Sequence, residues 1–177
     1  MSRTVPKPDF MTDEAWNQLM AGRQHDKIRD NSLNHVQAYL QTQGEQGTYL
    51  AQGGPTLVLG TIGRKSGEER LSMANFMPLG NKEVPQGDED VVVVGSIAGL
   101  ERPPAWALNL KDVPRGWVQV KDKRWNVNAR LVAGKEREEL WPKLTAFFPL
   151  WGHFQKYCDR EFMVFILSPV DDAHSPS

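Results

Sequence analysis

Six short segments rich in β-branched and aliphatic residues run through this chain, and each is bounded by glycine, proline or charged residues. They cover residues 56–62, 70–79, 90–96, 117–121, 125–132 and 162–168. Segments of this length and composition are typical of β-strands. The links between them are mostly short, which favours hairpin pairing over repeated parallel crossovers. We therefore expect a six-stranded antiparallel barrel with helices packed on it, a mainly β fold of the α+β class.

Helical spacing of apolar residues marks the stretches before and between these strands. Trp16 begins one such pattern, after a Thr12 whose side chain can cap free backbone amides. Residues 33–40 repeat the spacing, and further helices are expected at about 104–111 and 135–157.

The composition changes at Gly44, where glycine, glutamine and threonine become common, so residues 44–55 are expected to form a loop. The chain is thereby divided into an N-terminal helical arm over 1–44, a barrel domain over 45–170 and a polar tail over 171–177. We expect the tail to be disordered.

Composition excludes several classes of function. A chain of 177 residues fits a single hydrophobic core. Its 21 Lys and Arg balance 22 Asp and Glu, which removes the positive field that nucleic-acid binding requires. A single cysteine, Cys158, can form neither an internal disulfide nor a thiolate cluster, which favours a reducing, cytoplasmic setting. We expect no signal peptide and no transmembrane helix, because no apolar run approaches the roughly 20 residues that cross a bilayer.

Motifs for metal and hydrolase chemistry are missing from the sequence. No zinc-ligand spacing, Walker loop or GxSxG motif occurs. The four histidines, at positions 25, 35, 153 and 174, include no i, i+4 pair. We therefore expect no metal site and no serine nucleophile.

The first segment with chemical potential is TIGRKSG at 61–67, between two expected strands. Its two glycines allow a tight turn, while Arg64, Lys65 and Ser66 present two cations, a hydroxyl and several amides. Such a group can hold a phosphate or a chain of carboxylates. The alternative is an ordinary solvated hairpin turn.

The second segment is GSIAG at 95–99, followed by PAWALNLK at 104–111. Small residues at the end of a strand leave room for a flat ligand to approach the main chain. The helix that follows places Trp106 and Leu110 on one face, which would suit a tricyclic cofactor. Alternatively the small residues form a turn and Trp106 belongs to the core.

Taken together, these segments resemble a known family. GxxGRKSG at 60–67, the strand ending Gly95-Ser96, PxWxLNLK at 104–111 and several later motifs match, in order and spacing, the deazaflavin-dependent nitroreductases. The later motifs are Val118-Gln119-Val120, Ala129-Arg130 and Glu136-Arg137-Glu138 ahead of Leu140-Trp141-Pro142. The likeness runs from about Asn34 to Pro169. It implies a split β-barrel related to flavin-nucleotide oxidases, which binds the 8-hydroxy-5-deazaflavin coenzyme F420 and reduces quinones, enones or activated nitro compounds.

The resemblance also implies a set of site residues. Arg64 and Lys65 match the basic turn that holds the phosphate and polyglutamate tail of the coenzyme, and Ser96 matches the serine beside the deazaflavin ring, where it is the candidate catalytic residue. The expected coenzyme-binding residues are Gly63, Arg64, Lys65, Ser66, Gly67, Ser96, Ile97, Ala98, Gly99, Pro104, Ala105 and Trp106. A deazaflavin transfers a hydride, so the protein must present the acceptor to the ring and stabilise charge on the acceptor oxygen. The hydroxyl of Ser96 or nearby main-chain amides are suited to that role.

Two departures from the family pattern leave alternatives open. The best-known members carry a lysine at the position of Ile97, so FMN on the same barrel, or a non-catalytic binding module, are the other hypotheses. Where those members have tyrosines lining the acceptor site, this chain has Phe148, Trp151 and Phe154, with Tyr157 as a further substrate-binding candidate. Stacking and burial would then favour a flat enone or quinone over a polar nitroimidazole.

The segment around Pro149 completes the expected acceptor site. Phe147, Trp151, Phe154 and Cys158 fall at i, i+4, i+7 and i+11, which predicts one apolar, aromatic helix face. The proton that follows the hydride would come from water, His153 or Tyr157.

Partners are expected to be few. We expect a small planar acceptor and no nucleic acid. A second copy of the chain is a further candidate partner, since an antiparallel sheet with exposed edges can pair. Residues 16–40 carry no strong cationic excess, which favours packing on the barrel over peripheral contact with a membrane.

Overall fold

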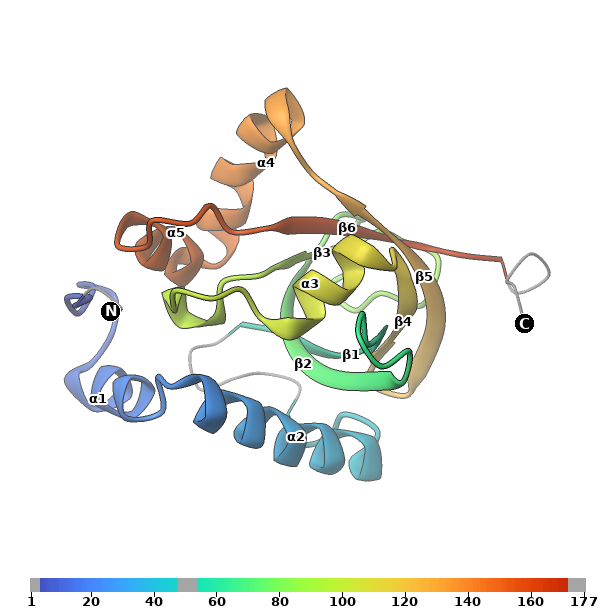
Figure 1. The fold of residues 1–177 in the computed structure, drawn as a ribbon, viewed down its shortest axis with the longest axis horizontal. Coiled ribbons are helices and arrows are strands. Elements are labelled where there is room, and N and C mark those ends of the chain that lie inside the picture. Colours follow the sequence, from blue (N-terminus) through green and yellow to red (C-terminus); the bar gives the residue numbers. More distant parts are fainter. Residues whose placement is uncertain (1–3, 48–53, 172–177) are drawn as a thin grey trace.

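The computed structural model describes residues 4–47 and 54–171. Six strands form a closed barrel in the order β1-β2-β3-β6-β5-β4, and every neighbouring pair is antiparallel. The strands are β1 (Thr56–Ile62), β2 (Glu69–Pro78), β3 (Val91–Val94), β4 (Arg115–Val120), β5 (Lys123–Leu131) and β6 (Val164–Pro169). The expected six-stranded antiparallel barrel is confirmed (Figure 1).

Helices cover the outside of the barrel, so several strands are buried on both faces. Leu57 and Leu59 of β1 point into the barrel core, whereas Val58 between them packs under a helix. The run of four valines in β3 divides in the same way, with Val91 and Val93 inside and Val92 and Val94 in a second, outer cluster. Because successive side chains alternate between faces, an unbroken apolar run is the pattern of a strand covered on both sides.

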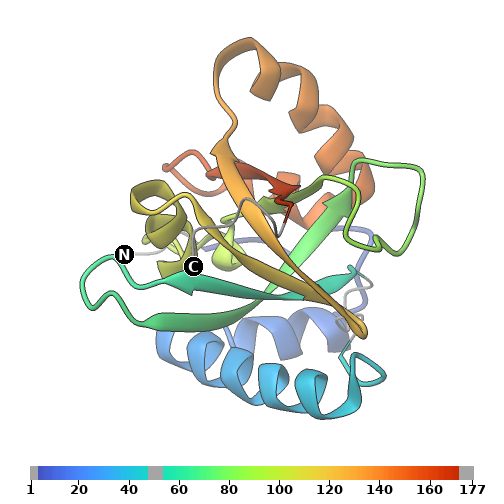
Figure 2. The same ribbon diagram turned by 90° about the vertical axis from the view of Figure 1, so that its right-hand side faces the viewer.

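The N-terminal arm packs against the barrel through α1 (Asp13–Ala21) and α2 (His25–Thr42). The Thr12 side chain caps α1 by accepting a hydrogen bond from the Ala15 N–H at 3.2 Å. On α2, Val36 and Tyr39 are buried against Val58 of β1. Figure 2 shows α2 running along one side of the barrel and α4 on the opposite side.

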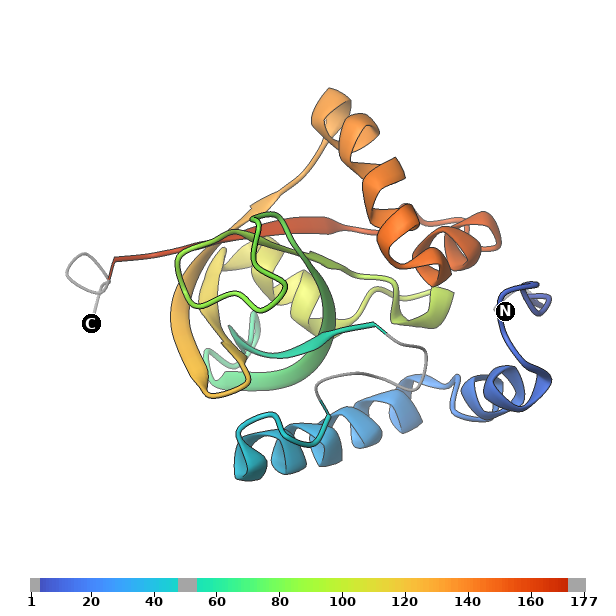
Figure 3. The same ribbon diagram turned by 180° about the vertical axis from the view of Figure 1, so that it is seen from behind.

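The two openings of the barrel are covered by different segments. Helix α3 (Ala105–Asp112) contributes Trp106, Ala107 and Leu110 to the barrel core. On the far side, the loop between β2 and β3 crosses the barrel, and its Val84 packs against the same core (Figure 3).

The helical region before β6 is divided into α4 (Gly134–Phe147) and α5 (Pro149–Lys156). The expectation that Phe147 shares a buried face with Trp151 is wrong, because Phe147 is 42% exposed. Phe148 has φ −133° and ψ 90°, which interrupts the helix and changes its angular register before Pro149 starts α5. Phe148 therefore takes the buried position, at 8% exposure.

Some expectations concern residues outside the described ranges. They are half of the loop at 44–55, namely residues 48–53, and the tail beyond Asp171. Among the described residues, no helix combines the length and hydrophobicity that a membrane crossing requires.

Candidate functional site

The basic turn between β1 and β2, residues 63–67, is tight and closed by main-chain hydrogen bonds. The Gly63 N–H donates to the Glu68 carbonyl at 2.7 Å, and the Gly67 N–H donates to the Gly63 carbonyl at 2.8 Å. Gly67 has a φ of +72°, a conformation that favours glycine. The turn leaves the side chains of Arg64 and Lys65 exposed to solvent.

Asn109 connects this turn to α3. Its Oδ1 accepts hydrogen bonds from the Arg64 N–H at 3.1 Å and the Arg64 Nη1 at 3.3 Å, and its Nδ2 donates to the Thr61 Oγ1 at 3.1 Å. Asn109 is only 3% exposed, and Thr61 is 1% exposed. The two sequence segments singled out above are therefore joined by a buried amide. This role of Asn109 was not predicted from the sequence; the signal there is a polar residue beside Leu110 on the apolar side of the helix.

The second segment forms a left-handed turn, defined here as residues 97–99. Ile97, Ala98 and Gly99 have φ values of 41°, 51° and 67°. The Gly99 N–H donates to the Ser96 carbonyl at 2.9 Å, and the Leu100 N–H donates to the Ile97 carbonyl at 3.1 Å. The left-handed region costs a residue with a Cβ roughly 1–2 kcal/mol, so neighbouring contacts must hold this turn in place.

The left-handed turn leaves hydrogen-bond donors free. Within the described part of the chain, the N–H groups of Ile97 and Ala98 and the hydroxyl of Ser96 have no hydrogen-bond partner. Ser96 itself is in the right-handed region, at φ −78° and ψ −43°. Right-handed followed by left-handed backbone brings successive N–H groups to one side, an arrangement that binds anionic oxygens.

Trp106 lies mostly in the barrel core. It is 8% exposed, and its ring centroid lies 6.3 Å from that of Phe165. Pro104 is buried and Ala105 is exposed at the start of α3. A Cβ on Gly95 would lie 3.3 Å from the Cβ of Ala107, so the small residue there allows the helix to approach the strand. The structure therefore favours the alternative in which Trp106 belongs to the core over the one in which it forms an open wall for a cofactor.

The aromatic residues expected at the acceptor site lie on α5 or directly beside its two ends. Phe148, Trp151 and Phe154 are all buried in one cluster, and Tyr157 packs against it. Trp16 of the N-terminal arm stacks on Phe154 with centroids 6.0 Å apart and planes inclined by 22°. Phe154 also borders the left-handed turn, since a Cβ on Gly99 would lie 3.1 Å from its Cβ.

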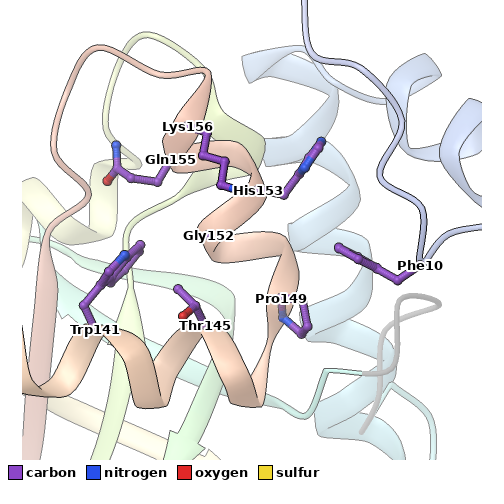
Figure 4. A pocket seen from close by; sticks show the side chains of 8 residues that line it. All are labelled: Phe10, Trp141, Thr145, Pro149, Gly152, His153, Gln155 and Lys156. Atoms are coloured by element: carbon purple, nitrogen blue, oxygen red, sulfur yellow. The ribbon is translucent and has the colours of Figure 1, made fainter.

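Two cavities lie near these elements, and neither is lined by Ser96 or Trp106. One of about 440 Å³ lies between Phe10, α4 and α5, where the His153 Nε2 is 2.7 Å from the Pro6 carbonyl oxygen (Figure 4). The other, of about 570 Å³, is lined by Thr61 and Ile62 at the end of β1 and by residues of β4 and β5. The second cavity thus borders the basic turn. Among the described residues, no cluster of side chains could hold a metal ion.

Comparison with known proteins identifies the family. Residues 31–169 match the model of the F420H(2)-dependent quinone reductases. A solved F420-H2-dependent reductase, FDR-A, is 30% identical with a TM-score of 0.53, over 64% of this chain and 94% of that one. A second solved structure, described as a domain-swapped dimer, is 26% identical with a TM-score of 0.56, over 81% of this chain and 98% of that one. The chain therefore belongs to the F420H2-dependent quinone reductase family, and its coenzyme is F420.

Proposed function

We propose that this F420H2-dependent reductase transfers a hydride to a planar, apolar, electron-poor acceptor such as a quinone or an enone. The observation that carries the proposal is the set of free donors at Ser96, Ile97 and Ala98, next to a helix that is bonded to a basic turn. The reduced coenzyme supplies the hydride when bound. The acceptor gains that hydride and one proton.

The basic turn is proposed to bind the phosphate and carboxylates of the coenzyme tail. The Arg64 guanidinium donates a hydrogen bond from its Nη1 to Asn109, so part of the conformational entropy of the side chain is lost before a ligand arrives. Lys65 is exposed and forms no ion pair among the described residues, so its charge is available. A guanidinium and an ammonium group on one turn fit a phosphorylated, polyanionic tail.

The left-handed turn is proposed to stabilise negative charge at the reacting end. When a hydride reaches an enone or quinone, charge develops on the acceptor oxygen. The N–H groups of Ile97 and Ala98 are oriented by the main chain, so little reorganisation of these donors accompanies the reaction, and the Ser96 hydroxyl lies beside them. Ser96 is the proposed catalytic residue.

The acceptor is proposed to be held by apolar contact near Phe154, which borders the turn. Trp151 and Phe148 support that face from the core, and none of the three has a phenolic hydroxyl to bind a nitro group. The His153 Nε2 faces the Pro6 carbonyl, where an imidazole N–H has a partner already. We therefore propose that water, rather than His153, supplies the proton.

Two further proposals concern the setting of the protein. The single cysteine supports a reducing, cytoplasmic compartment. The similarity to a domain-swapped dimer supports a homodimer, which size-exclusion chromatography with light scattering would measure.

A direct assay tests the proposed function. Purified protein is mixed with reduced F420, and oxidation of the coenzyme is followed by absorbance after addition of a naphthoquinone, a cyclohexenone or a nitroimidazole. We expect turnover with the quinone or the enone, slow reduction of the nitroimidazole, and none with reduced FMN. Coenzyme binding without turnover of any acceptor would favour the binding-module hypothesis, and fast nitroimidazole reduction would contradict the proposed acceptor site.

A further inference from the structure

Arg160, which follows α5, donates hydrogen bonds to three main-chain carbonyls around the left-handed turn. Its Nη1 bonds to the Gly95 oxygen at 2.9 Å, its Nη2 to the Ser96 oxygen at 2.7 Å and its Nε to the Leu100 oxygen at 2.9 Å. The planar guanidinium therefore bridges both ends of the turn. A lysine has one nitrogen and could not reproduce this arrangement.

Arg23, from the link between α1 and α2, binds the middle of the same turn. Its Nε donates to the Ala98 oxygen at 2.8 Å and its Nη2 to the Gly99 oxygen at 3.1 Å. Its Cζ lies 5.9 Å from the centroid of the Phe154 ring. The N-terminal arm is thereby attached to the turn as well as to the barrel.

The positive charge of these two residues is not neutralised locally. Over residues 4–47 and 54–171, neither Arg23 nor Arg160 forms an ion pair with a carboxylate. Burial lowers the pKa of both guanidinium groups. Two partly buried cations therefore lie beside a segment whose free N–H groups also favour negative charge.

The hydrogen bond from Arg160 also sets the direction of a free amide. The described chain contains no cis peptide bond, so the C=O and N–H of each peptide point in opposite directions. The Ser96 carbonyl points at the Arg160 guanidinium, and the Ile97 N–H of the same peptide must therefore point away from it. Arg23 holds the Ala98 carbonyl, which likewise directs the Gly99 N–H toward the Ser96 oxygen and closes the turn.

We propose that Arg160 and Arg23 are positioning residues of the coenzyme site. They hold the left-handed turn in its strained conformation, and Arg160 keeps the Ile97 N–H directed at the bound coenzyme and acceptor. Arg23 in addition makes docking of the N-terminal arm a condition for a complete site. This inference rests on the proposed function, because that function places the coenzyme ring at the turn.

The experiment compares Arg160→Lys and Arg23→Lys with the parent protein, since lysine keeps the charge and removes the planar fork. Arg137→Lys is the matched control: the Arg137 Nη2 also donates to a main-chain carbonyl, that of Phe162 at 3.1 Å, and its Cζ lies 4.7 Å from the Trp141 ring centroid. It has no hydrogen bond to the left-handed turn. Amide hydrogen exchange of Gly99 and Leu100 is measured without coenzyme, and the Kd for F420 is measured by fluorescence titration.

We expect exchange at Gly99 and Leu100 to accelerate about tenfold or more in both variants, and the Kd for F420 to rise by a similar factor, with Tm close to that of the control. Unchanged exchange, an unchanged Kd, or equal losses in Arg137→Lys would overturn the inference. If Arg160→Lys does not fold, Arg23→Lys alone decides the outcome, because Arg23 lies outside the barrel. A parent protein that binds F420 but reduces no acceptor would refute the proposed function, while the change in Kd would still decide the role of the arginines.

Discussion

The side-chain oxygen of Asn109 on α3 accepts hydrogen bonds from both the N–H and the guanidinium of Arg64, at 3.1 and 3.3 Å. This contact joins the turn proposed to bind the coenzyme tail to α3, across 45 residues of sequence. Ala107 of the same helix approaches Gly95, which precedes the left-handed turn.

Asn109→Ala removes the acceptor of two Arg64 donors and the donor to Thr61, which is 1% exposed. We expect the free energy of unfolding to fall by about 1–3 kcal/mol, since buried polar groups lose their partners. The Kd for F420 should rise as well, because Arg64 loses its anchor. Urea unfolding and fluorescence titration measure the two effects. Parent-like values in both would show that the amide is dispensable.

Lys65→Glu reverses an exposed charge on the basic turn. We expect weaker F420 binding in the variant, and in the parent a Kd that rises with ionic strength, because salt screens exposed charges. Lys143→Glu, an exposed substitution on α4, is the control and should leave the Kd unchanged. Equal binding by Lys65→Glu and the parent would remove Lys65 from the site.

Ser96→Ala tests the proposed catalytic hydroxyl, which has no partner among the described residues. Loss of one oriented donor in the transition state should lower kcat about tenfold or more, with a much smaller change in the Kd for F420. Ser168→Ala on β6 serves as the comparison. If turnover is the same in Ser96→Ala and the parent, Ser96 is a packing residue.

Trp151→Ala acts first on stability, because Trp151 is 2% exposed and packs 5.1 Å from the Phe148 ring centroid. Large-to-small substitution in a core costs about 3–5 kcal/mol, so thermal unfolding should show a marked loss. Trp151→Phe keeps most of the packing. In that milder variant we expect a higher KM for apolar acceptors with nearly unchanged coenzyme binding. A change confined to the Kd for F420 would place Trp151 at the coenzyme instead.

Tyr39 makes stability depend on pH in the alkaline range. Burial raises the pKa of its phenol above the ordinary 10.0, opposed by the hydrogen bond that its Oη accepts from the Lys121 N–H at 2.6 Å. The folded state thus favours the neutral phenol. The corresponding stability is complete below about pH 10 and is lost as pH rises through the folded value.

Tyr39→Phe should therefore be less stable than the parent at pH 7, because the Lys121 N–H loses its acceptor, but should lose less stability between about pH 9 and pH 11. Urea unfolding across that range is the measurement. Tyr157→Phe, at a half-buried position on the end of α5, is the control. Parallel pH profiles for Tyr39→Phe and the parent would contradict this account.

The strands and helices could be predicted from the sequence because their signals are local. The expected strand at 56–62 coincides with β1, and the others differ from the observed strands by a few residues at their ends. Alternation of side chains and glycine or proline at the turns depend on near neighbours in the chain, and the same holds for the tight GRKSG turn. The resemblance to a known family rests on the order and spacing of several such local motifs along the chain.

Only the tertiary structure decided how the site is held together. Arg23 and Arg160 lie 60 to 76 residues from the carbonyls that they bind, and nothing local to either arginine indicates that partner. Phe148 is buried and Phe147 is exposed because Phe148 has an extended conformation between α4 and α5. Strand and turn formation needs only short-range preferences, whereas the left-handed turn at Ile97 is stable because distant guanidinium groups bind its carbonyls, and such pairings follow from the folded packing rather than from spacing along the chain.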